Sequence, residues 1–387
     1  MIAKDDEARF AGRRFLMVLG QSQRIGGAEQ QAMLLARQLR EVIGAEVDFL
    51  AWGEPGDLAE RLQTERFPVH SFPLDWPQSS WKKFSRLFKL ASFIREVAKP
   101  EFLLPFIGFN CKIIGTIWRR TGASFTWWNQ RDEGRGVFGS RWERRVISGV
   151  PAVVSNSFEG RDFLTRTFQI PSHSVAVINN GVLPAGQTDS RVWRRRLNLG
   201  DDDRLITMVA NLTRFKDHQT LVKAFADLRS DDSTQRVHLC LAGRHGETAD
   251  RLKVAAFDEG LGGVMHLPGV VDDVPNLLAA SDFVVHSSVH EGCPNAVLEA
   301  MANRKAVCGT DISGMRQALG PNHDGVLAAP HDPQSLARIM SQLLADPSRR
   351  ARLEEQNVRR IQTEFSLEQL RRKVLGVIHG AVVNTAA

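Results

Sequence analysis

The sequence predicts an α/β protein made of two doubly wound, Rossmann-like domains that face each other across a cleft. Short apolar runs alternate with longer amphipathic segments along the whole chain, a pattern typical of parallel sheets with helical crossovers. The stretch 181–190, rich in glycine, proline and polar residues, reads as a linker that divides this series into two similar halves. A length of 387 residues leaves room for two domains.

The elements follow in order along the chain. Strands of the first half are expected at 15–19, 46–52, 67–72, 101–107, 124–129, 152–157 and 174–180, with helices at 28–42, 82–98 and 110–121. Strands of the second half are expected at 204–212, 237–243, 264–269, 282–288, 305–310 and 325–330, with helices between them. The predicted domains are 10–183 and 184–365, and a last helix within 366–387 is expected to pack back on the first domain. Ligands of such sheets bind beyond the carboxyl ends of the strands, so the cleft is the expected site.

Composition and charge narrow the functional classes. The formal net charge is +6, which permits anionic partners such as phosphates, nucleic acid or a lipid surface without choosing among them. The four cysteines are far apart and form no C-x-x-C pair, so neither a zinc site nor a disulfide framework is indicated. The N-terminus lacks the apolar core of a signal peptide, and no apolar run approaches the roughly 20 residues of a membrane span. A reduced, cytoplasmic setting is expected.

A glycine-rich turn follows the first predicted strand. In "GQSQRIGGAEQQ", Gly20, Gly26 and Gly27 precede a helix that starts near Ala28. Glycines let the backbone approach a bulky anion, and the N–H groups of a helix start then point at it. The pattern is neither G-x-G-x-x-G nor a P-loop, and a plain strand-to-helix turn explains it equally well.

Two glutamates flank a helix start in "HEGCPNAVLEAMA", residues 290–302. Glu291 lies in the loop and Glu299 lies two turns into an apolar helix, where a lone carboxylate is costly without a partner. Glu299 is placed to reach the hydroxyls of a ribose, and Glu291 those of a second sugar. The plainer interpretation makes Glu291 a cap and leaves Glu299 in solvent.

The residues between the two glutamates suit a phosphate. Gly292 permits a tight backbone, and Pro294 suits a first helical turn because it needs no N–H donor. The amides of Cys293, Asn295 and Ala296 would then point at a phosphate. A diphosphate between two sugars has this order of groups.

These motifs resemble those of the retaining GT-B glycosyltransferases of family 4. The E-x7-E signature of that family matches Glu291 through Glu299. Further matching segments run in order along nearly the whole chain: "IGGAEQQA", "VVSNSFEGRDFL", "VAVINNGV", "NLTRFKDHQTLVKAF", "LCLAGRHG", "HLPGVVDDVPNLLAASD" and "GVLAAPHDPQSLA". The resemblance implies that the second domain binds a nucleotide-sugar donor and that the first mostly holds the acceptor.

The resemblance also implies roles for single residues. Glu299 resembles the ribose ligand, Glu291 the ligand of the donor sugar, and Lys216 the lysine that neutralises the diphosphate. Other donor-site residues implied by the family are the segment from Gly292 through Cys293 and Pro294 to Asn295, Gly243 and Arg244 of the nucleotide pocket, and Gly26 and Gly27 from the other domain.

Three positions depart from the family pattern. Asn211 stands where the family usually has an arginine, and Arg214 is a candidate to supply that charge. The family's first-domain histidine has no counterpart between His70 and His173. Asn110, or the run "NQRDEGR" at 129–135, is expected to take its place. The acceptor-side candidates are therefore Asn110, Asn129, Arg131 and Asp132. Gln317 replaces the usual glutamate of a later loop.

The residues predict transfer without a metal or cofactor. Lysine, a neighbouring arginine and helix-start amides can stabilise charge on a leaving diphosphate. The D-x-D pattern at 201–203 lies before a strand and is interpreted as a solvated turn. The resemblance implies retention of anomeric configuration, a UDP-sugar or GDP-sugar donor, and an acceptor glycan, lipid-linked glycan or small molecule of cell-envelope or exopolysaccharide assembly.

The segment "WKKFSRLFKLASFIRE", residues 81–96, has two interpretations. Phe84, Leu87, Phe88 and Ala91 form an apolar stripe flanked by lysines and arginine. The favoured interpretation is a crossover helix with this stripe on the sheet. The alternative is a helix lying on the inner face of an anionic membrane, which would bring the enzyme to a lipid-linked acceptor.

Two competing functions remain at this stage. An epimerase of nucleotide sugars shares the two-domain architecture, although E-x7-E favours transfer. A nucleic-acid-binding protein would suit the sequence pI of about 9.4. Its basic residues, however, are scattered along the chain, and no zinc finger or RNP-like motif appears, so no nucleic-acid partner is expected.

Overall fold

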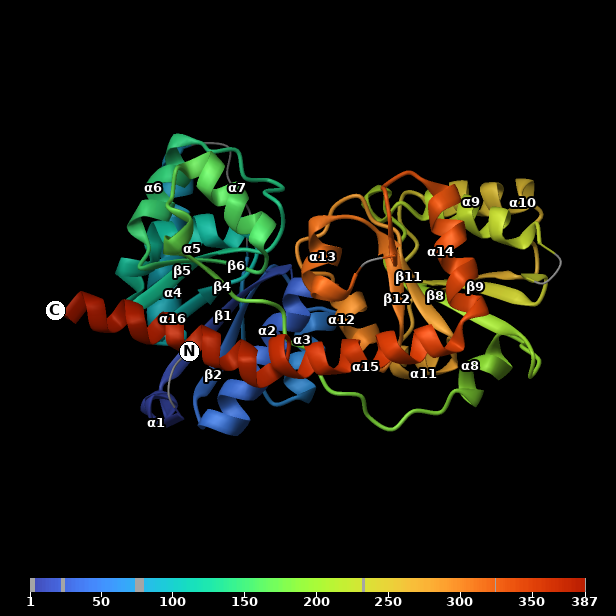
Figure 1. Cartoon of the computed structure of the whole chain (residues 1–387). Helices are drawn as coiled ribbons and strands as arrows, with labels where there is room; N and C mark the ends of the chain where they lie inside the picture. The colour runs from blue at the N-terminus through green and yellow to red at the C-terminus, as the bar shows by residue number, and fades with distance from the viewer. Residues whose placement is uncertain (1–3, 22–24, 74–79, 232–233, 324, 387) are drawn as a thin grey trace. The chain divides into compact units, whose positions relative to one another are not determined.

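The computed structural model describes residues 4–21, 25–73, 80–231, 234–323 and 325–386. The chain divides into two compact units (Figure 1). Unit 1 contains Met1–Gly181 together with Leu367–Ala387, and unit 2 contains Val182–Ser366. The domain limits expected from the sequence, 183/184 and 365/366, lie close to these divisions.

Unit 1 is built on a sheet of seven parallel strands in the order β3-β2-β1-β4-β5-β6-β7. The order reverses between β1 and β4, which makes this a switch point where the loops after neighbouring strands diverge. The strands are β1 (Arg14–Gln21), β2 (Glu46–Trp52), β3 (Val69–Phe72), β4 (Phe102–Pro105), β5 (Phe125–Gln130), β6 (Ala152–Ser155) and β7 (Val175–Val177).

Helices cover both faces of this sheet because side chains alternate along each strand. On β1, Phe15 and Met17 pack with one helix layer, whereas Leu16 and Val18 pack with the other. The first layer is α2 (Gly27–Gln38), α3 (Asp57–Thr64) and α16 (Leu367–Ala386), and the second is α4 (Ser80–Val97), α5 (Gly108–Thr121), α6 (Arg141–Gly149) and α7 (Phe158–Phe168). Short helical turns are α1 (Lys4–Glu7), η1 (Ala8–Phe10), η2 (Leu39–Ile43) and η3 (Ser172–Ser174).

Unit 2 repeats the arrangement with six parallel strands in the order β10-β9-β8-β11-β12-β13. The strands are β8 (Arg204–Val209), β9 (Val237–Ala242), β10 (Met265–Gly269), β11 (Phe283–His286), β12 (Val307–Thr310) and β13 (Leu327–Ala328). Its helices are α8 (Arg191–Arg196), η4 (Arg214–Lys216), α9 (His218–Arg229), α10 (Ala249–Asp258), α11 (Val274–Ala280), α12 (Asn295–Ala302), α13 (Ser313–Leu319), η6 (Gly320–Asn322), α14 (Pro333–Ala345) and α15 (Pro347–Glu364). The switch point lies between β8 and β11, which pair directly.

The predicted fold class of two parallel, Rossmann-like α/β domains is confirmed. The last helix, α16, belongs to unit 1 and packs beside α2. The stripe expected on α4 needs correction, because Phe84 and Phe88 are exposed. The buried side of α4 is formed by Leu87, Leu90, Ala91 and Ile94, and the side chains of Trp81 and Lys82 lie outside the described part. In the part of the chain that the structure describes, none of the helices has the length and apolar character needed to cross a bilayer.

Candidate functional site

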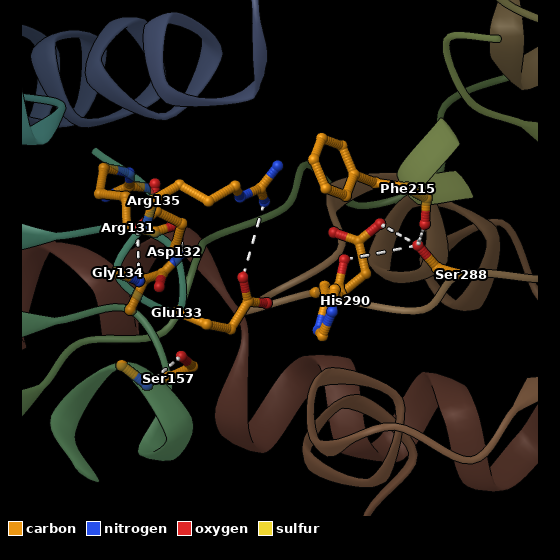
Figure 2. Close-up of polar contacts among 12 residues, drawn as sticks. Arg131, Asp132, Glu133, Gly134, Arg135, Ser157, Phe215, Ser288 and His290 are labelled. Atoms are coloured by element: carbon orange, nitrogen blue, oxygen red, sulfur yellow. Dashed lines mark hydrogen bonds and ion pairs between the residues drawn. The ribbon is translucent and has the colours of Figure 1, made fainter. Parts of the chain in front are cut away.

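The loops after β8 and β11 lie together at the switch point of unit 2. Three contacts hold the turn η4 against the segment that follows β11. The Ser287 hydroxyl lies 3.2 Å from the carbonyl of Lys216, and the Val289 amide donates to the Phe215 carbonyl at 3.0 Å. The Ser288 hydroxyl donates to the same Phe215 carbonyl at 2.9 Å, as Figure 2 shows. These contacts fix the position of η4 relative to the segment that follows β11, and so the distance between side chains on the two segments.

Lys216 and Glu291 form an ion pair across this junction. The Oε1 atom of Glu291 also lies 3.0 Å from Nε2 of His286, the last residue of β11, and 3.2 Å from the Ser288 hydroxyl. His286 and Ser288 are buried, whereas a quarter of the Lys216 side chain is exposed. One carboxylate oxygen is thus held by an ammonium group, an imidazole and a hydroxyl, with the ammonium group at the surface.

Electrostatics keep Glu291 ionised. Burial pushes the pKa of Glu291 upward, but the charge of Lys216 and the hydrogen bond from His286 outweigh it and leave the pKa well below its ordinary value. Burial lowers the pKa of His286, so at neutral pH its ring is neutral and Nε2–H donates to the carboxylate. His218, buried at the start of α9, has its pKa lowered to about 3 by burial and then by His286 and Lys216. The cluster therefore contains one cation, one anion and two neutral imidazoles.

Glu299 differs from Glu291 in both position and charge state. It lies on α12, and within the described residues its carboxylate has neither a hydrogen-bond partner nor an ion-pair partner. Burial raises the pKa of Glu299 to about 7. A carboxyl group held without a partner at a strand-end site is placed to accept hydrogen bonds from a ligand.

The loop between the two glutamates depends on small residues around it. Pro294 is the N-cap of α12, which begins at Asn295. Behind the loop, a Cβ atom on Gly314 would lie 2.4 Å from the carbonyl oxygen of Glu291. A Cβ on Gly309 would likewise lie 2.2 Å from the carbonyl oxygen of His286. Glycine at these two positions lets the backbone of β12 and α13 lie directly against the segment that carries Glu291. Gly292 and Cys293 complete the loop between Glu291 and Pro294.

Asn211, Gly243 and Arg244 connect the ends of β8 and β9. The Asn211 side-chain oxygen accepts from the Arg244 amide at 3.1 Å. Gly243 has φ +158°, and a Cβ there would lie 2.0 Å from the carbonyl oxygen of Ala210. Asn211 therefore fixes a neighbouring loop instead of supplying charge. Arg214 is exposed, and its guanidinium lies 4.7 Å above the Phe215 ring.

The turn into α9 contains a further feature that the sequence reading missed. Asp217 has φ +43°, a left-handed conformation that aspartate tolerates better than most residues. Its carboxylate accepts from the Thr220 hydroxyl at 2.8 Å and caps α9. The spacing of Asp217 and Thr220, D-x-x-T, could have predicted this cap. The role of His286 could not be predicted in this way, because in the sequence it is an ordinary residue of a strand.

In unit 1, the glycine turn accommodates a carboxylate of the chain itself. Glu29 is buried, and its Oε2 atom accepts from the amide of Gly26, the N-cap of α2, at 3.1 Å. A Cβ on Gly20 or Gly26 would lie 3.2 or 2.9 Å from this carboxylate. The glutamate three residues after the N-cap is the signal that could have predicted this. Residues 22–24 of the turn lie outside the described residues, and an approach of Gly26 and Gly27 to a donor phosphate stays a prediction.

Asn110 and Asn129 are buried inside unit 1. The Asn110 oxygen accepts from the Trp52 indole at 2.7 Å, and its amide nitrogen donates to the carbonyls of Val18 and Phe106. Its two amide hydrogens are thus used in joining α5 to β1 and to the turn that leads into the helix. These contacts give Asn110 a structural role and leave it no hydrogen to donate to an acceptor.

The loop after β5 places charged groups at the carboxyl-terminal edge of the unit 1 sheet. Asp132 organises the loop, since its carboxylate accepts from the amides of Gly134 and Arg135 at 2.9 and 3.0 Å (Figure 2). Arg131 donates to the side chain of Asn180 at 2.5 Å. Glu133 and Arg135 form an ion pair of 3.7 Å. Glu133, which the sequence reading did not single out, is therefore a further charged group of the predicted acceptor side.

The aspartates at 201–203 lie far from these strand ends. Asp202 and Asp203 pair with Arg236 near the start of β8. Over the described residues, no group of three or more histidine, cysteine or acidic side chains is arranged to hold a metal ion. All four cysteines are free.

Two doubly wound units, with charged loops at the switch point of one, are the architecture of GT-B glycosyltransferases. Residues 189–360 match the family described as "Glycosyl transferases group 1", and residues 25–185 match "Glycosyltransferase Family 4". Both halves of the chain therefore carry a glycosyltransferase family signature. Together the two matches span most of the chain and, with the fold, place it in the GT-B, family 4-like group of glycosyltransferases.

Curated relatives match parts of the chain. The lipopolysaccharide core biosynthesis glycosyltransferase LpsE of Rhizobium meliloti is 31% identical over 179 residues, 46% of this chain and 51% of that protein. The D-inositol 3-phosphate glycosyltransferase of Salinispora arenicola is 31% identical over 257 residues, 62% of this chain and 57% of that protein. The chain thus spans little more than half the length of these relatives.

Solved structures share the fold over the full chain. Anabaena Alr3699/HepE, in complex with UDP and glucose, aligns with a TM-score of 0.80 at 18% identity, over 95% of this chain and 100% of that one. WaaG, a glycosyltransferase involved in lipopolysaccharide biosynthesis, aligns with a TM-score of 0.70 at 15% identity, over 95% of this chain and 100% of that one. At these identities the likeness establishes the fold.

Proposed function

We propose that the chain is a retaining, metal-independent glycosyltransferase that moves a sugar from a nucleotide-sugar donor to an acceptor glycan, lipid-linked glycan or small molecule. The observation that carries the proposal is the cluster of Lys216, Glu291 and His286 at the switch point of unit 2, with Glu299 on the adjoining helix. Two matched glycosyltransferase families support it, as do relatives named as a lipopolysaccharide core biosynthesis glycosyltransferase and a D-inositol 3-phosphate glycosyltransferase.

The cluster suits a nucleoside diphosphate bonded to a sugar. Lys216 is the cation of the cluster and its ammonium group is partly exposed, so a diphosphate can compete with Glu291 for it. Glu291, released in part from that pair, keeps its bond to His286 and can accept from a sugar hydroxyl. Glu299 can accept from ribose hydroxyls, which lowers its pKa and offsets the cost of its burial.

The proposed transfer breaks one bond at the anomeric carbon and forms another. The bond between the anomeric carbon and the diphosphate oxygen breaks, and the electron pair leaves with the phosphate. The acceptor oxygen bonds the same carbon on the same face, and its proton passes to the departing phosphate. Lys216 and the exposed Arg214 stabilise the growing negative charge, a contribution of about 10²–10³ in rate for one donor group. No step requires a metal ion.

The proposed donor and the proposed pathway are both supported by the names of similar proteins. UDP-sugars and GDP-sugars are the proposed donors, and the first is supported by a structural neighbour that was solved with UDP and glucose. Cell-envelope or exopolysaccharide synthesis is the proposed setting, because relatives are named for lipopolysaccharide core and lipopolysaccharide synthesis. The acceptor is proposed to meet unit 1 near Arg131 and Glu133.

Thermal unfolding with UDP, GDP, ADP and dTDP tests the donor site, since a ligand of the folded state raises its apparent stability. One diphosphate should raise the melting temperature with EDTA present. The matching nucleotide sugar should then be consumed only with an acceptor, and NMR of the product should show the anomeric configuration of the donor. Consumption without acceptor that yields an epimer would replace transfer by epimerisation, and inverted product would exclude retention.

A further inference from the structure

The charge of unit 1 is concentrated in one of its two helix layers. Within the layer of α4, α5, α6 and α7, the sequences of α4, α5 and α6 contain eleven lysines and arginines and two glutamates, a formal charge of +9. The fourth helix, α7, adds two basic and two acidic residues and so no net charge. The opposite layer, α2, α3 and α16, contains five basic and four acidic residues, a formal charge of +1. The whole chain carries +6, so the α4–α6 layer holds more positive charge than the protein has in total.

The exposed cations of this layer are not neutralised by the protein. Several arginines elsewhere in unit 1 are paired with carboxylates, as in Arg13–Glu101 and Arg37–Glu65. Among the described residues, no carboxylate lies within ion-pairing distance of the exposed cations of α4, α5 and α6. These exposed cations are Lys89, Arg95, Arg119, Arg120, Arg141, Arg144 and Arg145. Salt screens the mutual repulsion among them only in part, and an external anionic surface would offset the rest.

Aromatic side chains emerge between these cations. On α4, Phe84 is 60% and Phe88 50% exposed, and on α6, Trp142 is 43% exposed. The helices α4 and α6 both pack beside α5, so these rings belong to one continuous layer (Figure 1). Arg120 lies 4.7 Å above the Phe88 ring. The exposed rings and cations are thus gathered on adjoining helices, and a contiguous patch, unlike a single exposed ring, marks an interaction surface.

Two hollows in the layer are lined by arginines together with apolar side chains. One, of about 380 Å³, lies between α4 and the end of α5 and is lined by Phe88, Arg95 and Arg119. The other, of about 770 Å³, lies beside α6 and is lined by Arg141, Arg145 and Phe168. Each offers a guanidinium for a phosphate and an apolar wall for the hydrocarbon next to it.

We infer that the α4–α5–α6 layer is a docking surface for an anionic phospholipid bilayer. Its guanidinium groups meet lipid phosphates, while Phe84, Phe88 and Trp142 enter the boundary between headgroups and acyl chains. Basic residues near such a surface contribute roughly 1 kcal/mol each. Nucleic acid would also meet the charge, but it would leave the exposed phenylalanines in water. The surface stands apart from the proposed transfer reaction; only its link to a lipid-linked acceptor rests on that function.

Vesicle flotation of the full chain tests this inference without any sugar donor. The wild-type chain should float with vesicles of phosphatidylcholine mixed with phosphatidylglycerol, remain behind with phosphatidylcholine alone, and dissociate as salt rises. A variant with Lys89→Gln, Arg95→Gln and Arg145→Gln should lose about 100-fold in partitioning, as expected from three cations. Phe84→Ser with Phe88→Ser should weaken binding and make the remainder more sensitive to salt.

Helix α10 of unit 2 provides a matched control, because it also exposes a phenylalanine, Phe257, beside cations. A variant with Arg251→Gln, Lys253→Gln and Phe257→Ser should bind vesicles as the wild type does. Equal losses in both sets, or equal binding to neutral and anionic vesicles, would overturn the inference. Retention on duplex DNA without vesicle binding would overturn it in favour of nucleic acid. Vesicle binding by a chain that transfers no sugar would uphold this surface and remove the proposed function.

Discussion

Lys216 and Glu291 form a direct ion pair that joins the turn after β8 to the loop after β11. The two residues are 75 positions apart in sequence and meet because β8 and β11 are neighbours in the sheet. The pair is neutral as a whole. Removal of either partner leaves the other charge largely buried and uncompensated, which is costly. Effects on binding and effects on stability must therefore be measured separately.

Lys216→Ala should lower kcat by about 10²–10³-fold, because the leaving phosphate loses its nearest cation. Lys223→Ala is the matched control, since Lys223 is an exposed lysine of the next helix. Steady-state release of nucleoside diphosphate measures the effect, and circular dichroism checks the fold. Turnover within a few-fold of the wild type would show that Lys216 serves only to hold Glu291.

Glu299→Gln should stabilise the protein at high pH while it weakens nucleotide binding. The pKa of Glu299 is raised from 4.5 to about 7, so its stabilising contribution is complete below pH 4.5 and is lost as pH rises to 7. Above pH 7, the variant should therefore be more stable than the wild type by about 1–3 kcal/mol. Denaturant unfolding at pH 4.5 and pH 8 measures this difference.

Glu291→Gln is the internal control, because the pKa of Glu291 is lowered. Its stabilising contribution is present above pH 4.5 and is lost as pH falls below that value. This variant should be less stable than the wild type at pH 8, the reverse of Glu299→Gln. The same pH dependence in both variants would contradict the opposite charge environments of the two residues.

Arg214→Ala should reduce kcat by about tenfold or more with little loss of stability. The Arg214 side chain is exposed and lies on Phe215, so it can turn toward a ligand without breaking an ion pair among the described residues. Charge-assisted hydrogen bonds are about twice as strong as neutral ones. Asn211→Ala, which removes a neutral bond to the Arg244 amide, should cost less. Near-normal turnover of Arg214→Ala would make Arg214 a bystander.

Gly314→Ala should impair turnover although Gly314 lies outside the E-x7-E segment. The added Cβ would come within 2.4 Å of the Glu291 carbonyl oxygen, so the loop that carries Glu291 must move. We expect a loss of about 1–3 kcal/mol in stability as well as reduced kcat. Gly262→Ala is the control, since its Cβ would meet no atom within 4 Å. Equal kinetics of the two variants would show that the loop has room to adjust.

The sequence was most informative where local patterns decide the structure. The alternation of apolar and amphipathic runs predicted two parallel-sheet domains, since each buried strand reads as an apolar run. It could not predict the ion pair between Lys216 and Glu291, which depends on the order of strands in the sheet. The opposite charge states of Glu291 and Glu299 also depend on tertiary surroundings, namely Lys216 and His286 near the first and apolar neighbours around the second.

Other features depend on the partners of a side chain, which are not visible in the chain. Asn110 was expected to replace the family's first-domain histidine, and the structure shows that Trp52 and two carbonyl groups use its amide. The stripe on α4 included Phe84 and Phe88 because spacing alone cannot tell which part of an apolar helix meets the sheet. Their exposure became visible only once Leu90 and Ile94 were placed in the core.

Calorimetric titration of the full chain with nucleosides and nucleoside diphosphates separates the two parts of the proposed donor site. We expect that one nucleoside diphosphate binds, that Lys216→Ala weakens binding of the diphosphate and spares the nucleoside, and that Glu299→Gln weakens binding of both. This division places the ribose at Glu299 and the diphosphate at Lys216. Failure of UDP, GDP, ADP and dTDP alike to bind the wild-type chain, or unchanged affinities in both variants, would show that Lys216 and Glu299 do not form a nucleotide site.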